Sequence, residues 1–76
     1  MAYDQEIDTT GLKCPLPVLR ARKSLKSMNK GELLSMIADD PASQIDVPHF
    51  CAEQNLRLVL AEETNKDIFH YVIEAG

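Results

Sequence analysis

Residues 11–17 read Gly-Leu-Lys-Cys-Pro-Leu-Pro, and they separate a strand-like pattern from a helix-like pattern. Before them, residues 3–9 alternate with the two-residue period of a strand, which places four side chains on one side: Tyr3, Gln5, Ile7 and Thr9. After them, apolar side chains recur at helical spacing: Val18, Ala21, Leu25 and Met28. Gly11 ends the strand, and Pro15 and Pro17 suit the first turn of a helix, where a missing N–H is tolerated. The segment therefore predicts a strand followed directly by a helix whose apolar stripe faces the core.

The rest of the chain continues this alternation. The first helix is expected to run to about Met28, because Asn29 and Gly31 are stop signals. Residues 32–38 predict a second strand, and Asp40 is a suitable N-cap before Pro41. Because Pro48 would break a helix that began at Pro41, we expect a short turn over 41–45 and a second helix over 46–55, capped by Asp46. Residues 56–63 and 67–74 predict two strands joined by a hairpin near residues 64–66.

The predicted order is βαβαββ. Strands joined through a helix are expected to be parallel with a right-handed crossover, and the last two strands form an antiparallel hairpin. We therefore predict a single domain over residues 1–76, an α/β two-layer sandwich whose four-stranded mixed sheet carries two helices on one face. In the last two strands the alternation places Leu56, Leu58 and Leu60 on one face, and Phe69, Tyr71 and Ile73 on one face.

The length and composition limit the possible functions. A chain of 76 residues buries only about 60% of the surface of its unfolded state, which leaves no room for an enclosing active site or a large cofactor site. The hydrophobic content of 45% argues against disorder, and the net charge of −4 argues against a general nucleic-acid binder. The charge is uneven, because residues 13–30 hold six basic and no acidic side chains: Lys13, Arg20, Arg22, Lys23, Lys26 and Lys30.

The N-terminal residues are acidic and polar, without the basic and apolar regions of a secretory signal. The longest apolar run, residues 58–61, is far shorter than a membrane span. We therefore expect a cytoplasmic protein without membrane contact. In that compartment Cys14 and Cys51 are expected to be reduced thiols rather than a structural disulfide.

Cys14 stands directly before the predicted helix. Free N–H groups, the helix dipole and the charge of Lys13 all favour the thiolate, so we expect a lowered pKa and a reactive sulfur. A buried apolar cysteine is the alternative interpretation. The chain has no Cys-x-x-Cys pair, and nothing in the sequence places His49 or His70 near Cys14. A thiolate without an evident base, acid or pocket suits a group carrier better than a self-sufficient enzyme.

Gly-Leu-x-Cys-Pro-x-Pro followed by a basic helix resembles the TusA/SirA family of small sulfur carriers. The resemblance continues in Asp39-Asp40-Pro41 and in residues 48–51, and it spans about residues 7–74. It implies that Cys14 accepts sulfane sulfur as a persulfide and passes it on, with Gly11, Pro15 and Pro17 as supporting motif residues. It also implies a cysteine desulfurase or a rhodanese-like enzyme as the donor and a relay protein as the acceptor. The acceptor would serve tRNA thiolation, cofactor biosynthesis or sulfur oxidation.

The outer side of the first helix predicts a docking surface beside Cys14 for an acidic partner, formed by Lys13, Leu16, Leu19, Arg20 and Lys23. The alternative is that Leu19 packs against the second helix and the basic side chains are only solvated. The resemblance implies a sulfurtransferase or persulfide carrier that acts with partner enzymes.

The remaining aspartate, cysteine and histidine side chains are expected to have structural roles. Asp39 and Asp40 are expected at the sheet edge that also holds Cys14, with a capping role, because a carboxylate near the thiol would raise its pKa. Cys51 is expected in the core, with a resolving thiol as the alternative. His49 and Cys51 point apart on a helix, so we expect no metal site, and we expect no cofactor and a monomer.

Two other functions remain as alternatives to the sulfur carrier. One is a nucleic-acid or ribosome-associated module that uses the basic helix, although the net charge and the lack of aromatic side chains in the basic segment argue against direct nucleic-acid contact. The other is a redox-sensing thiol protein.

Overall fold

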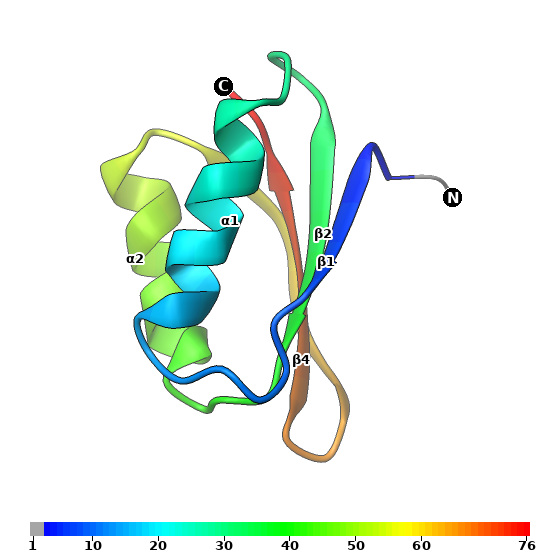
Figure 1. The fold of residues 1–76 in the computed structure, drawn as a ribbon, viewed down its shortest axis with the longest axis vertical. Coiled ribbons are helices and arrows are strands. Elements are labelled where there is room, and N and C mark those ends of the chain that lie inside the picture. Colours follow the sequence, from blue (N-terminus) through cyan, green and yellow to red (C-terminus); the bar gives the residue numbers. More distant parts are fainter. Residues whose placement is uncertain (1–2) are drawn as a thin grey trace.

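The computed structural model describes residues 3–76 as two helices packed on one face of a four-stranded sheet (Figure 1). The chain runs through β1 (Gln5–Asp8), α1 (Leu16–Lys26), β2 (Leu33–Ala38), α2 (Ser43–Glu53), β3 (Arg57–Asn65) and β4 (Ile68–Glu74). The sheet order is β1-β2-β4-β3. β1 is parallel to β2, and β4 is antiparallel to both β2 and β3. The predicted two-layer sandwich with βαβαββ order is therefore confirmed.

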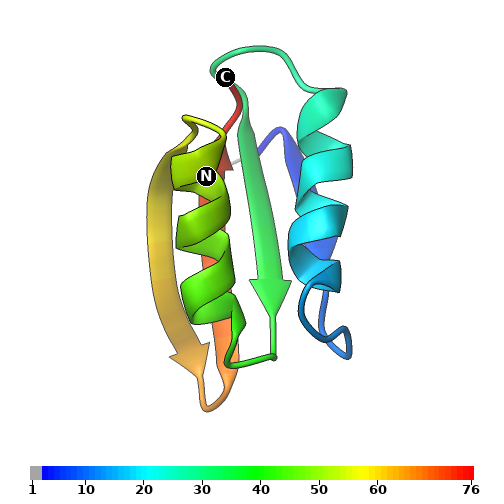
Figure 2. The same cartoon turned by 90° about the vertical axis from the view of Figure 1, so that its left-hand side faces the viewer.

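Both helices begin at the same edge of the sheet (Figure 2). This follows from the topology, because each helix comes after a strand and the two strands β1 and β2 are parallel. The loops that precede α1 and α2 consequently lie side by side, and Cys14 is in the first of them. Neither helix within residues 3–76 has the length and apolar character needed to cross a bilayer.

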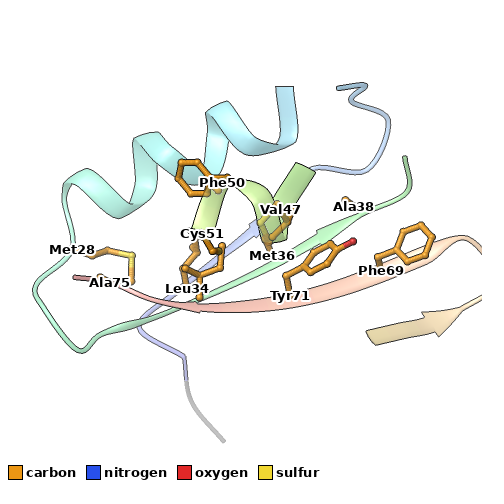
Figure 3. Close-up of a cluster of buried hydrophobic side chains, with 12 residues drawn as sticks. Met28, Leu34, Met36, Ala38, Val47, Phe50, Cys51, Phe69, Tyr71 and Ala75 are labelled. Atoms are coloured by element: carbon orange, nitrogen blue, oxygen red, sulfur yellow. The ribbon is translucent and has the colours of Figure 1, made fainter. Parts of the chain in front are cut away.

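The core lies between the helices and the sheet (Figure 3). The predicted apolar stripe of α1 is confirmed, since Ala21 and Met28 are buried and Val18 and Leu25 pack against the same cluster. The other elements contribute Leu34 and Met36 from β2, Val47, Phe50 and Cys51 from α2, and Phe69, Tyr71 and Ile73 from β4. One polar pair crosses this layer, a hydrogen bond of 2.8 Å between Ser43 Oγ and the Tyr71 hydroxyl.

The second helix differs from its prediction. It begins at Ser43, not at Asp46, and Pro48 lies inside it. A proline in a helix removes one hydrogen bond, here to the carbonyl of Gln44. Gln44 is exposed, so water can satisfy that carbonyl, and Val47, Phe50 and Cys51 bury an apolar face that stabilises the helix. Asp46 therefore lies in the first turn of α2 instead of capping it.

The third strand differs from its prediction in the position of Leu60. Leu56 and Leu58 pack against the core, but the pairing with β4 shifts between Leu58 and Leu60. Leu58 pairs with Ile73 and Leu60 pairs with Val72, and neighbouring residues of a strand point to opposite faces. The irregularity at Val59 therefore places Leu60 on the sheet face without helices.

Candidate functional site

Cys14 is an exposed, free cysteine in the loop between β1 and α1. The helix begins two residues later, with Pro15 at its N-cap and Pro17 buried in its first turn. The predicted position of the thiol at the start of a proline-rich helix is therefore confirmed, and the alternative of a buried apolar cysteine is wrong.

Two aspartates tie the Cys14 loop to the start of α2. The backbone N–H of Gly11 donates to Asp39 Oδ1 over 2.9 Å, and the N–H of Cys14 donates to Asp40 Oδ2 over 2.7 Å. The other oxygen of Asp40 accepts the N–H of Ala42 over 3.1 Å. The N-cap of α2 is Ala42, without a side-chain cap, so Asp40 does not cap this helix as expected. Asp40 instead holds the turn before α2 and the backbone of the cysteine itself. These hydrogen bonds, together with the charge of Lys13, lower the pKa of Asp40.

The electrostatic environment of the thiol is the reverse of the prediction. Hydrogen bonding to Asp46 is the largest cause that raises the pKa of Cys14, followed by desolvation and by the negative charges of Asp46 and Asp40. The start of α1 offers few backbone N–H groups that could stabilise the thiolate and lower this pKa. Pro15 and Pro17 carry no N–H, and the N–H of Leu16 donates to the carbonyl of Lys13 over 2.8 Å. The same prolines that mark the helix start in the sequence remove the donors that would stabilise a thiolate.

A shallow cleft of about 180 Å³ opens beside Cys14 between the two helices. It is lined by Cys14, Pro15 and Val18 on the α1 side, and by Asp46, His49, Phe50 and Glu53 on α2. His49 Nε2 lies 3.5 Å from Glu53 Oε1, and both side chains are largely exposed. We call this hollow the Cys14 cleft. Its floor is apolar and its α2 rim carries two carboxylates.

Asp46, His49 and Glu53 were not predicted as site residues. Their spacing of three and four places them on one face of a helix, but that face can be oriented only when the limits of α2 are known. The predicted start at Asp46 made this residue a cap and hid the pattern. The only signal in the sequence is the spacing itself, read on a helix that runs through Pro48.

The predicted docking residues are exposed beside the thiol. Leu16 and Leu19 keep 47% and 48% of their surface, so Leu19 is not buried against α2. Lys13, Arg20 and Lys23 are also exposed. Leu19 and Lys23 line a separate shallow hollow with Arg22 and Lys26. All five predicted docking residues are thus accessible, on α1 or in the loop before it.

The other thiol and the second histidine lie elsewhere. Cys51 is only 2% exposed, and burial raises its pKa to about 11. His70 is on the sheet face opposite the helices, where its Nε2 lies 2.7 Å from Ser35 Oγ. Within residues 3–76 no three side chains of His, Cys, Asp or Glu are grouped to hold a metal ion.

Comparisons with known proteins agree with this fold. The profile of a family described as "Sulfurtransferase TusA" matches residues 5–75. The solved structure of the SirA-like protein from Desulfitobacterium hafniense superimposes with a TM-score of 0.82. The two chains are 25% identical, and the match covers 95% of this chain and 97% of the other.

Proposed function

Because the chain belongs to the TusA sulfurtransferase family, whose members pass sulfur between donor and acceptor proteins, we propose that it carries sulfane sulfur as a persulfide on Cys14. The observation that supports this role most directly is the exposure of Cys14 in a loop held by Asp39 and Asp40. A carrier must offer the same sulfur to two different proteins, and an exposed atom on a fixed backbone meets this need. We take residues 1–76 as one carrier domain.

Transfer into the carrier begins with the Cys14 thiolate. It attacks the terminal sulfur of a persulfide on the donor's cysteine. The bond between the two donor sulfurs breaks as a new S–S bond to Cys14 forms. The terminal sulfur keeps its hydrogen, and the donor cysteine leaves as a thiolate. Sulfur leaves the carrier by the same step with an acceptor thiolate as the attacking group, so no external oxidant or reductant is needed.

The partners supply what this small domain lacks. We propose a cysteine desulfurase or a rhodanese-like enzyme as the donor and a sulfur-relay protein as the acceptor, serving tRNA thiolation, cofactor biosynthesis or sulfur oxidation. The carrier does not complete any of these reactions alone, because the Cys14 cleft is shallow and open. The family match gives no support to the alternative of a nucleic-acid or ribosome-associated module.

The carrier role is tested by intact-mass measurement after incubation with a cysteine desulfurase and cysteine. We expect the protein to gain one sulfur atom that is lost on reduction. Cys14→Ser should abolish the gain, and Cys51→Ser should leave it intact, because Cys51 is buried. A gain of sulfur on Cys51 alone would overturn the assignment. The absence of any gain in the wild-type protein and in Cys51→Ser would do the same.

We also propose that the donor docks on the exposed surface formed by Lys13, Leu16, Leu19, Arg20 and Lys23. The combination of half-exposed leucines and cations fits a partner surface with apolar and acidic side chains. In Lys23→Glu the rate of sulfur uptake should fall, and the difference from the wild type should shrink at high salt. An unchanged rate at low and high salt would exclude Lys23 from the docking surface.

A further inference from the structure

The sheet face that carries no helix has an apolar centre (Figure 1). We call it the open sheet face. Residues paired across the strands share a face, so the register gives five outward aliphatic side chains: Leu33 and Ile37 from β2, Ile68 and Val72 from β4, and Leu60 from β3. All but Val72 keep part of their surface exposed. Outward positions on the solvated side of a sheet are ordinarily polar, so this centre is typical of a surface that packs against another protein.

The side chains of the open sheet face form three rows that cross β2, β4 and β3 in that order. The first row consists of Leu33, Glu74 and Arg57. The middle row consists of Ser35, Val72 and Leu60. The third row consists of Ile37, His70 and Glu62. On the edge strand β1, Glu6 extends the middle row and Asp8 extends the third. The first and third rows therefore both begin with an aliphatic residue, and they end in opposite charges.

We propose that the open sheet faces of two copies of this chain pack against each other, around a two-fold axis that lies between the sheets and runs across the strands. Such an axis places the first row of each copy on the third row of the other, and each middle row on itself. The resulting contacts are complementary in these rows: Arg57 with Glu62, Glu74 with His70, Leu33 with Ile37, and Val72 and Leu60 with their own counterparts. The dimer has four layers, with the two sheets inside and the helices outside.

The charges select this axis over an axis along the strands. An axis along the strands would place β1 of one copy over β3 of the other, so that Asp8 faces Glu62 and like charges meet. With the axis across the strands, Arg57 faces Glu62 of the second copy, and both long side chains reach across the angle of about 30° between packed sheets. Glu6 then faces Glu6 of the second copy at the rim, where water and salt screen the repulsion.

The size of the open sheet face indicates a weak dimer. The molecule measures 31 × 27 × 17 Å, and the sheet spans the longest and the shortest of these dimensions (Figures 1 and 2). Each copy therefore offers roughly 500 Å², and the roughly 1,000 Å² of both copies is at the lower end of specific interfaces. The monomer expected from the sequence then prevails only at low concentration. Cys14 and the exposed side of α1 belong to the helix layer, so they stay accessible in the dimer.

Sedimentation equilibrium of the full chain tests the dimer, with a reductant present so that Cys14 forms no disulfide between copies. Between about 20 µM and about 1 mM protein at low salt, the average mass should rise from that of one chain toward that of two. A mass that stays at the monomer value over this range would overturn the inference. So would a mass that passes beyond two chains, because a two-fold contact is closed. Neither result bears on the carrier function, which needs no second copy.

Two variants that lose the same charge from the same face should have opposite effects. Glu62→Gln removes the carboxylate that faces Arg57 of the second copy, so the dissociation constant should rise about fivefold. Glu6→Gln removes the repulsion between the two copies of Glu6, so the dissociation constant should fall about twofold. Tighter association of Glu62→Gln, which an axis along the strands predicts, would contradict the proposed arrangement. Circular dichroism confirms that each variant is folded.

Charge reversal identifies the pair that joins the two copies. Arg57→Glu should weaken the dimer about tenfold, because it places two carboxylates opposite each other at each of two symmetric contacts. The double variant Arg57→Glu, Glu62→Arg restores the pair with its signs exchanged, so most of the lost affinity should return. The matched control Lys66→Glu makes the same change of charge in the turn between β3 and β4 and should leave the dissociation constant unchanged. A double variant no tighter than Arg57→Glu, or a control as weak as Arg57→Glu, would show that Arg57 does not meet Glu62 and would overturn the inference.

Discussion

The surroundings of Cys14 and of Cys51 both raise a thiol pKa, and they do so by different means. Cys51 is enclosed in the core by the packing of α2, and burial alone is the cause. Cys14 is exposed, and carboxylates of the neighbouring βα unit are the main cause. Burial can be removed only by unfolding, whereas a negative charge can be offset by any cation that approaches. Only the exposed thiol can therefore be switched by a partner.

The largest expected difference between the two thiols is in their access to a small reagent. In the native protein, iodoacetamide should modify Cys14 at least about a hundredfold faster than Cys51, because Cys51 reacts only through opening of the core. The two rates are measured separately by mass spectrometry in Cys51→Ser and Cys14→Ser. In strong denaturant the difference should vanish. Comparable rates in the folded protein would show that the core around Cys51 opens readily.

The next expected effect is on stability at high pH. In the unfolded chain the Cys51 thiol loses its proton near the ordinary pKa of 9.0, while the folded protein keeps it until about pH 11. Between these values the folded state binds more protons than the unfolded state, so the free energy of unfolding falls as the pH rises. Below pH 9 the stabilisation that comes from the raised pKa of Cys51 is fully present. Replacing Cys51 with alanine should reduce that fall by about 1–2 kcal/mol. Urea denaturation at pH 8 and pH 11 measures it.

Both proteins in that experiment should carry Cys14→Ser, so that Cys51 is the only cysteine that titrates. All other side chains are the same in both proteins, so their contribution to the pH dependence cancels in the difference. An equal fall in the two proteins would mean that the folded state does not retain the Cys51 proton.

The smallest expected effect concerns the charge beside Cys14. In Asp46→Asn the carboxylate that opposes the thiolate is absent, so the pKa of Cys14 should fall and the alkylation profile should move to lower pH. At pH 8 the rate of alkylation should rise by a factor of roughly two to five. Glu62→Gln on β3 makes the same change of charge away from the thiol and should leave the profile in place. A slower reaction in Asp46→Asn would mean that Asp46 assists the thiolate.

Local patterns predicted most of this fold. The alternation is confirmed over residues 5–8, and so is the stripe of Val18, Ala21, Leu25 and Met28, because each segment has one buried face, which leaves a clear period. Tyr3 was misplaced, because it precedes β1 and its ring lies 6.0 Å from that of His70 on the sheet face without helices. Leu60 was misplaced because the irregularity at Val59 changes the phase of a strand without any glycine or proline to mark it. The start of α2 was misplaced because the packing of Val47, Phe50 and Cys51 outweighs one hydrogen bond lost at Pro48.

The site was predicted in position but not in its electrostatics. Parallel strands place their following loops at one edge, and this was enough to bring Asp39 and Asp40 to the Cys14 loop. The sign of the pKa shift depends on which backbone N–H groups remain free at the start of α1 and on where Asp46 points. Both features depend on how the two helices pack together. Neither produces a periodic pattern in the sequence from which it could be predicted.

The carboxylate of Asp40 joins the loop before α1 to the turn before α2. It binds the backbone of Cys14 with one oxygen and the backbone of Ala42 with the other, so the sulfur-bearing loop and the start of α2 cannot shift independently. The hydrogen bonds that Asp40 accepts lower its pKa, so its carboxylate stays ionised when the surroundings become mildly acidic. The position of Cys14 relative to α2 is therefore kept down to a lower pH than an aspartate with an ordinary pKa would allow.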